Sequence, residues 1–136
     1  MTTTPIRVVA AVVSRGETDA EYLICQRPPH KQHGGLWEFP GGKCEPDESD
    51  LAATRRELHE ELGVTVTGVG APLMTAREPG SSYEIVFIPA TIEGEPVCHE
   101  HDALQWCTAH ALLALPLAPS DRACAEWLIA QPSRAR

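Results

Sequence analysis

The sequence predicts an α+β domain, because strand-like apolar runs alternate with segments of helical period. The strongest strand signals are two nearly continuous apolar runs, Ile6–Val13 and Tyr83–Ile92, which read as buried strands of one sheet. The strongest helix signal is an acidic segment that stops at Gly63, and a second helical segment covers Pro119–Ile129. These four segments carry the fold assignment.

Length and composition limit the chain to one modest core. It has 136 residues, 43% of them apolar and 22% charged, which is ordinary for a globular domain. We expect one domain over residues 1–130 and a flexible tail over residues 131–136. Five cysteines without a C-x-x-C pair favour free thiols, and no stretch resembles a signal peptide or a membrane span, so we expect a cytoplasmic protein.

The N-terminal half is predicted to contain three strands. Ile6–Val13 forms a central strand, and the alternating segment Glu21–Arg27 forms its hairpin partner. That second strand ends at the Pro28-Pro29 pair, which breaks regular structure. Leu36–Phe39 also alternates and leads directly into Pro40-Gly41-Gly42.

The C-terminal half is predicted to alternate strands and helices. Short strands or helical turns are expected at Val64–Val69, Leu73–Arg77, Leu104–Cys107 and Ala109–Leu115. In the last helix, Pro119–Ile129, Ser120 is the expected N-cap, and Cys124, Trp127 and Leu128 form the buried stripe.

The acidic helix before Gly63 concentrates carboxylates on one face. Asp47, Ser49 and Asp50 supply capping chemistry, and the buried stripe is expected to consist of Leu51, Leu58 and Leu62. At about 100° per residue, the carboxylates of Glu57, Glu60 and Glu61 share one arc. A solvated face with Arg–Glu pairs is the simpler interpretation. The adjoining acidic loop and the Gly-Gly pair instead favour a divalent-cation site for a phosphorylated ligand.

This stretch resembles the Nudix box, G-x5-E-x7-R-E-U-x-E-E-x-G-U, where U is aliphatic. Every fixed position is matched, by Gly42, Glu48, Arg56, Glu57, Leu58, Glu60, Glu61, Gly63 and Val64. The resemblance implies a Nudix hydrolase that uses Mg²⁺ or Mn²⁺ on nucleoside diphosphate derivatives. It also implies an α/β/α sandwich, with a mixed sheet between the box helix and a C-terminal helix. The stretch GLWEFPGGK is similar to the MutT-like members.

The resemblance assigns the catalytic machinery residue by residue. It implies metal ligation by Glu57, Glu60, Glu61, the Gly41 carbonyl and Glu100. Arg56 would orient Glu57, Glu48 would support the loop, and either Glu57 or Glu100 would accept the proton of the attacking water. The implied reaction converts a nucleoside triphosphate, oxidised or modified in some members, to the monophosphate and pyrophosphate.

Substrate contacts are expected from five further residues. Arg27 precedes the box at a spacing where similar enzymes contact the nucleotide, although a surface charge is the plainer interpretation. Trp37 or Phe39 could wall or stack on the base, and Lys43 could neutralise a phosphate. Asp121 lies where MutT-like enzymes place a base-reading Asn or Asp, although an acid there also simply caps a helix. Its carboxylate would suit cytosine or guanine.

Other interpretations remain open at this stage. His99 and His101 could face one way as zinc ligands, but no third ligand has a recognisable spacing. Pro79 lies where ADP-ribose hydrolases of the family often have proline, and a catalytically silent nucleotide-binding module is a third possibility. The net charge of −8 argues against binding duplex nucleic acid, and we expect a monomer or homodimer.

Overall fold

One mixed sheet runs through the centre of the computed structural model, which describes residues 4–131. The strand order is β3-β2-β1-β7-β5, while β4 pairs with β1, β6 with β7 and β8 with β2. The strands are β1 (Ile6–Arg15), β2 (Glu21–Gln26), β3 (Trp37–Glu38), β4 (Gly41–Lys43), β5 (Thr65–Val69), β6 (Met74–Ala76), β7 (Tyr83–Glu93) and β8 (Ala103–Thr108).

The two apolar runs of the sequence are neighbours at the centre of the sheet. β1 and β7 pair in parallel, in a continuous register from Ile6 opposite Tyr83 to Val13 opposite Ala90. The predicted hairpin of β1 and β2 is correct only next to the turn, where Ser14 and Arg15 meet β2. β2 pairs along its full length with β8 on one edge. On its other edge it pairs with β1 only next to the turn and then with β3, because β4 pairs with Val8–Ala10 on that side of β1 and β7 pairs along the opposite side.

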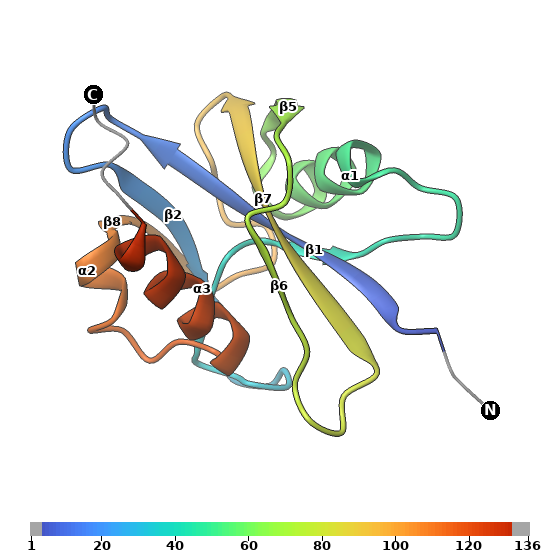
Figure 1. Ribbon diagram of the computed structural model, residues 1–136. Helices are drawn as coiled ribbons and strands as arrows, with labels where there is room; N and C mark the ends of the chain where they lie inside the picture. Colours follow the sequence, from blue (N-terminus) through green and yellow to red (C-terminus); the bar gives the residue numbers. More distant parts are fainter. Residues whose placement is uncertain (1–3, 132–136) are drawn as a thin grey trace.

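Helices cover both faces of this sheet. α1 (Asp50–Leu62) lies on one side of the β1–β7 pair, and α2 (Ala109–Leu112) and α3 (Pro119–Ala130) lie on the other (Figure 1). Side chains of β1 alternate accordingly: Val9, Ala11 and Val13 belong to the clusters beneath α1, and Ala10 and Val12 to the cluster beneath α3. The predicted mixed sheet between the box helix and a C-terminal helix is confirmed.

The ends of α1 have the predicted chemistry. The side chain of Ser49, the N-cap, accepts a hydrogen bond from the Ala52 N–H at 3.1 Å. Gly63 ends the helix in the left-handed conformation, with φ of 71°, and its N–H donates to the His59 carbonyl. Leu58 and Leu62 are fully buried and Leu51 packs beside them, as expected.

The start of α3 corrects one prediction. Ala118 is the N-cap and makes no side-chain cap, and Pro119 begins the helix. Ser120, predicted to be the N-cap, lies inside the first turn, and its hydroxyl donates to Glu78 Oε2 at 2.9 Å. The helix runs to Ala130 and ends at Gln131, so the predicted tail, apart from Gln131, lies outside the described residues.

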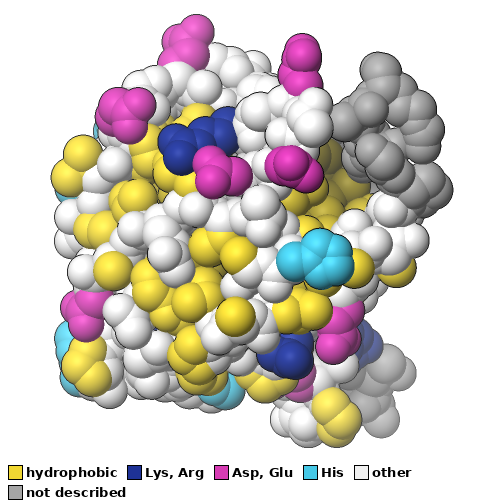
Figure 2. Space-filling model, turned by 90° about the vertical axis from the view of Figure 1, so that its left-hand side faces the viewer, with side chains coloured by type: hydrophobic (Ala, Val, Ile, Leu, Met, Phe, Trp, Pro, Cys, Tyr) yellow, Lys and Arg dark blue, Asp and Glu magenta, His cyan; other side chains and the backbone are white. Residues whose placement is uncertain are grey.

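The surface over β2, β8, α2 and α3 mixes apolar and charged side chains. Figure 2 shows that acidic side chains surround hydrophobic ones on this face and that lysine and arginine are sparse there. Within residues 4–131, none of the helices has the length and apolar character needed to cross a membrane.

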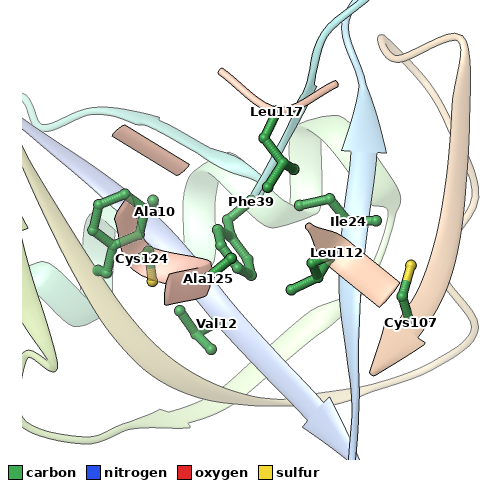
Figure 3. Close-up of a cluster of buried hydrophobic side chains, with 10 residues drawn as sticks. Ala10, Val12, Ile24, Phe39, Cys107, Leu112, Leu117, Cys124 and Ala125 are labelled. Atoms are coloured by element: carbon green, nitrogen blue, oxygen red, sulfur yellow. The ribbon is translucent and has the colours of Figure 1, made fainter. Parts of the chain in front are cut away.

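The core beneath α3 holds Phe39, which lies two residues before the glycine pair. Phe39 is 3% exposed and packs edge-on against Phe87, with ring centroids 5.9 Å apart. Figure 3 shows its ring among side chains from β1, α2 and α3, including Val12, Leu112 and Ala125. This packing anchors the chain one step before Pro40 and so places the Gly41–Lys43 strand against β1.

Candidate active site

Arg56 joins the acidic loop to the carboxylates of α1. Its guanidinium binds Glu48 through two hydrogen bonds of 2.8 and 2.7 Å and donates a third, of 2.8 Å, to Glu57. A fourth goes to the Lys43 carbonyl. The hydrogen bonds from Arg56 and from the Glu45 N–H hold the pKa of Glu48 at about 2. If Arg56 orients Glu57 and Glu48 supports the loop, these are the contacts that both roles require.

The glycine pair lets the backbone approach this carboxylate cluster closely. A Cβ at Gly41 would overlap the carbonyl oxygen of Val9 in β1. A Cβ at Gly42 would overlap the carboxylate of Glu57. At Gly41 the contact is with backbone, so glycine is required there, whereas at Gly42 it is with the end of a side chain, so the Glu57 carboxylate lies directly against β4.

Glu61 is the buried carboxylate of the helix. Its side chain is 7% exposed, and its Oε1 atom has no hydrogen-bond partner. Burial is the main reason that the pKa of Glu61 is well above its ordinary value, and the nearby carboxylate of Glu57 raises it further. Glu60, by contrast, is half exposed. The three box carboxylates thus occupy three different environments.

The chain before β8 folds back onto the end of α1. The backbone N–H groups of Val97 and His99 donate to the carbonyls of Leu62 and Glu61. The His99 ring nitrogen Nδ1 lies 3.2 Å from the Glu60 carbonyl oxygen. These contacts satisfy the last carbonyls of the helix and bring exposed Glu100 close enough to influence Glu61 electrostatically.

A second chain of polar contacts, from Arg27 to His101, was not predicted from the sequence. The guanidinium of Arg27 binds both oxygens of Glu38, at 3.0 and 3.2 Å. Glu38 Oε2 in turn lies 2.9 Å from His101 Nε2. The Nδ1 atom of that ring has no hydrogen-bond partner and lies 3.9 Å from Glu61 Oε1. His99 and His101 therefore diverge, and the two rings do not share one site.

A cleft of about 810 Å³ lies beside this cluster and reaches α3. Its lining includes Gly42 and Lys43 of the box loop and Asp121 of α3. Of the predicted substrate contacts, Arg27, Lys43 and Asp121 line it. The ammonium of Lys43 also lies 5.2 Å from the centre of the Tyr83 ring.

Asp121 is held at the buried end of the cleft. Its Oδ1 atom accepts the backbone N–H of Phe39 at 2.9 Å. Burial raises the pKa of Asp121 to about 8, although the Phe39 N–H lowers it. The hydrogen bond thus connects α3 with the segment that carries the glycine pair.

Two predicted substrate contacts do not line the cleft. The Phe39 ring belongs to the core, and only its backbone reaches the site, through Asp121. Trp37 packs against the same core cluster. An alternating aromatic pair next to a glycine loop cannot by itself indicate which face points inward, and here both side chains serve packing.

Several cleft residues gave no signal in the sequence. Glu38 and Tyr83 lie within strands, and Glu78 lies in a turn, yet all three line the cleft together with Ser120. Glu78 could have been found only through its bond to Ser120, which links positions 42 residues apart. Pro79, which suggested ADP-ribose, also lines the cleft.

The donor set suits a hard divalent cation shared with a substrate. Within the described range, no three His, Cys, Asp or Glu side chains are already gathered to hold a metal. A buried carboxylate oxygen without a partner, on Glu61, is nevertheless adjacent to Glu57 and to the loop of Glu100. Mg²⁺ commonly takes one or two carboxylates and completes its shell with phosphate oxygens and water. The residues present fit that arrangement.

The chain is similar in sequence to two bacterial nucleotide hydrolases. The chain is 43% identical over 120 residues to a CTP pyrophosphohydrolase of Escherichia coli K12, covering 85% of each chain. It is 31% identical over 115 residues to an 8-oxo-dGTP diphosphatase of Haemophilus influenzae, covering 83% of this chain and 84% of the relative.

Solved structures agree with these relatives. A MutT structure from work on Aliivibrio salmonicida and Vibrio cholerae superposes with a TM-score of 0.80 at 31% identity, covering 93% of this chain and 98% of that one. Residues 4–128 match the family described as NUDIX domain. The intact box, the sandwich and these likenesses lead to one conclusion: the chain is a MutT-like member of the Nudix hydrolase family.

Proposed function

We propose that this protein hydrolyses nucleoside triphosphates to the monophosphate and pyrophosphate with Mg²⁺ or Mn²⁺, and that cytidine nucleotides are its preferred substrates. The observation that carries the proposal is the cleft between the box loop and Asp121. The cleft is lined by Lys43, which suits a metal-bound triphosphate, and by Asp121, which suits a base. Gly42, which also lines it, lies directly against the carboxylate of Glu57. The 43% identity to a CTP pyrophosphohydrolase favours cytosine over oxidised guanine.

Each residue near the box has a defined part in this reaction. Glu57, Glu60, Glu61, Glu100 and the Gly41 carbonyl would hold the divalent cation, which when bound would offset phosphate charge and make water more acidic. Arg56 holds the Glu57 carboxylate in place through its 2.8 Å hydrogen bond. Glu57 and Glu100 are the two candidates for accepting the proton of the attacking water.

The two cationic side chains Arg27 and Lys43, which both line the cleft, differ in how they are bound. Arg27 is bound to Glu38 and to the Gln32 carbonyl, so part of its hydrogen-bonding capacity is already used. Lys43, which makes a cation–π contact with Tyr83, is free to swing toward a phosphate. We therefore assign Lys43 to the triphosphate and Arg27 to the wall of the nucleotide site.

The deciding experiment is a kcat/KM panel with Mg²⁺ at substrate concentrations below KM. It compares CTP, dCTP, 5-methyl-dCTP, dGTP, 8-oxo-dGTP and ADP-ribose, and pyrophosphate is identified as a product. The Asp121→Asn variant is measured beside the wild-type protein. The proposal expects a cytidine advantage that decreases in Asp121→Asn, because the amide replaces a carboxyl group at the base.

The other outcomes point elsewhere. A large advantage for 8-oxo-dGTP would assign the protein to removal of oxidised guanine nucleotides. Turnover of ADP-ribose alone would overturn the base assignment and give Pro79 a role in the cleft. Absence of turnover on every substrate would favour a binding module.

A further inference from the structure

The gap between His101 and Glu61 is the least explained feature of the buried site. His101 Nδ1 and Glu61 Oε1 are buried polar atoms without hydrogen-bond partners, and they face each other at 3.9 Å. The two side chains are only 6% and 7% exposed. A separation of 3.9 Å is too long for a direct hydrogen bond. Buried polar groups are normally satisfied, so this pair requires a partner.

The contacts of the ring determine which of its nitrogens carries a hydrogen. Both oxygens of Glu38 accept hydrogen bonds from Arg27, and a carboxylate has no hydrogen to donate. His101 Nε2, 2.9 Å from Glu38 Oε2, therefore donates. In the neutral imidazole, Nδ1 then presents a lone pair toward Glu61. A lone pair facing a carboxylate oxygen is unfavourable, and a proton or a metal cation between the two atoms removes the repulsion.

A cation between these two atoms satisfies both. Metal–nitrogen and metal–oxygen bonds of about 2.0–2.2 Å allow one ion to contact two donors separated by 3.9 Å. Histidines that bind metals usually donate their other ring N–H to a carboxylate, which fixes the tautomer. Glu38 occupies that position, and Arg27 in turn fixes Glu38.

We propose that His101 is a nitrogen ligand of the catalytic divalent cation and binds it together with Glu61. Glu38 holds the His101 ring through its other nitrogen, and Arg27 holds Glu38. This inference rests on the proposed metal site, because Glu61 is one of its assigned ligands. Substrate phosphate oxygens and the other carboxylates would complete the coordination.

A nitrogen ligand changes which cation the site prefers. Oxygen donors alone suit Mg²⁺, whereas imidazole favours transition metals, with affinity rising from Mn²⁺ to Co²⁺. The site is therefore expected to bind Mn²⁺ and Co²⁺ in clear preference to Mg²⁺. His99, two residues earlier, makes a backbone contact to Glu60 and lies outside this arrangement, so it provides a matched control.

The test is pulsed electron paramagnetic resonance on the full chain with Mn²⁺ alone. A coordinated imidazole nitrogen modulates the electron spin echo, and replacing histidine by its ¹⁵N-labelled form changes that modulation. The wild-type protein is expected to show directly coordinated histidine nitrogen. His101→Gln should lose the signal and His99→Gln should retain it. Titrations should show Mn²⁺ and Co²⁺ binding weakened by about tenfold or more in His101→Gln, with a smaller change for Mg²⁺.

The outcomes separate this inference from the proposed activity. Bound Mn²⁺ without histidine nitrogen coupling in the wild-type protein overturns the assignment, even if His101→Gln fails to fold. Absence of Mn²⁺ binding overturns both proposals. Nitrogen coupling in a protein that turns over none of the nucleotides supports His101 as a ligand and rejects the activity.

Discussion

Glu57 is held from two sides before any substrate arrives. Arg56 donates a hydrogen bond to it, and β4 lies against its carboxylate so closely that a Cβ at position 42 would overlap it. An acidic side chain with so little freedom is already arranged for one task, which reduces the reorganisation needed when charge develops.

Replacing this carboxylate tests its role directly. Glu57→Gln keeps the size of the side chain and removes the charge that would bind a cation or accept a proton. We expect kcat to fall by two or more orders of magnitude, with little change in thermal stability. Steady-state kinetics with Mg²⁺ and a circular dichroism melt check both parts. Near wild-type turnover in Glu57→Gln would refute the metal-helix account.

Asp121 makes stability depend on pH in a predictable direction. Its pKa is raised from 3.8 to about 8 in the folded protein, so between these values the folded chain binds more protons than the unfolded chain. Its contribution to stability is therefore complete below about pH 4 and is lost as the pH rises to about 8.

Asp121→Asn removes this titration while its side-chain oxygen can still accept the Phe39 N–H. The stability advantage of the variant over the wild-type protein should grow between pH 5 and 8, by on the order of 1 kcal/mol per pH unit. Urea unfolding at pH 5, 6, 7 and 8 measures the difference. Parallel pH profiles of the two proteins would show that burial does not perturb this carboxyl group.

The residues that sequence analysis identified are those close to one another in the chain. Arg56, Glu57 and Glu61 lie within one helix, so their common arc follows from helical geometry. Glu38 and His101 are 63 positions apart, and their contact depends on how β3 and the chain before β8 meet. No local period encodes such a contact, which is why the support of the buried site was missed.

At the scale of elements, β4 contributes more to the site than its three residues suggest. Gly41–Lys43 has no apolar or β-branched residue that predicts a strand, and it is extended because it pairs with Val8–Ala10 of β1. This pairing presents the glycine backbone to α1. The strand was therefore invisible in the sequence, whereas the capping cluster, the apolar stripe and the stop of α1 at Gly63 were predicted.

Gly42→Ala tests this close approach. The added methyl group would overlap the end of the flexible Glu57 side chain, which can move aside, so the fold should survive. We expect kcat to fall by about tenfold or more, since a displacement of about 1 Å is costly to catalysis. Gly68→Ala in β5, where the new Cβ would meet Thr91 Oγ1 at an ordinary 3.6 Å, is the control. Equal activity loss in both variants would indicate a general strand effect.

At the scale of the whole molecule, negative charge and a buried carboxylate should make stability depend on divalent cations. The chain carries a net charge of −8, and the pKa of Glu61 is raised by burial and by Glu57. Ionised Glu61 therefore opposes folding near neutral pH, and a bound cation relieves this cost.

Saturating Mg²⁺ or Mn²⁺ should raise Tm by several degrees, since ligand at about 100 times Kd stabilises a protein by about 2.7 kcal/mol. NaCl at matched ionic strength should give a smaller rise, because it only screens charge. Glu61→Gln should melt at a higher temperature than the wild-type protein without metal and respond less to metal. An identical response to both salts would argue against a specific cation site.

The parallel pairing of β1 and β7 also determines when this protein can fold during its synthesis. Ile6 emerges from the ribosome early, but its partner Tyr83 is translated only after α1, β5 and β6. Contacts between such distant positions form slowly, because a long loop must close first. The segment that ends at Val64 contains the whole Nudix box, yet it lacks the strand that completes the centre of the sheet. A nascent chain therefore carries its box helix well before the sheet can be completed, and until β7 is made the edge of β1 that pairs with β7 has no partner strand.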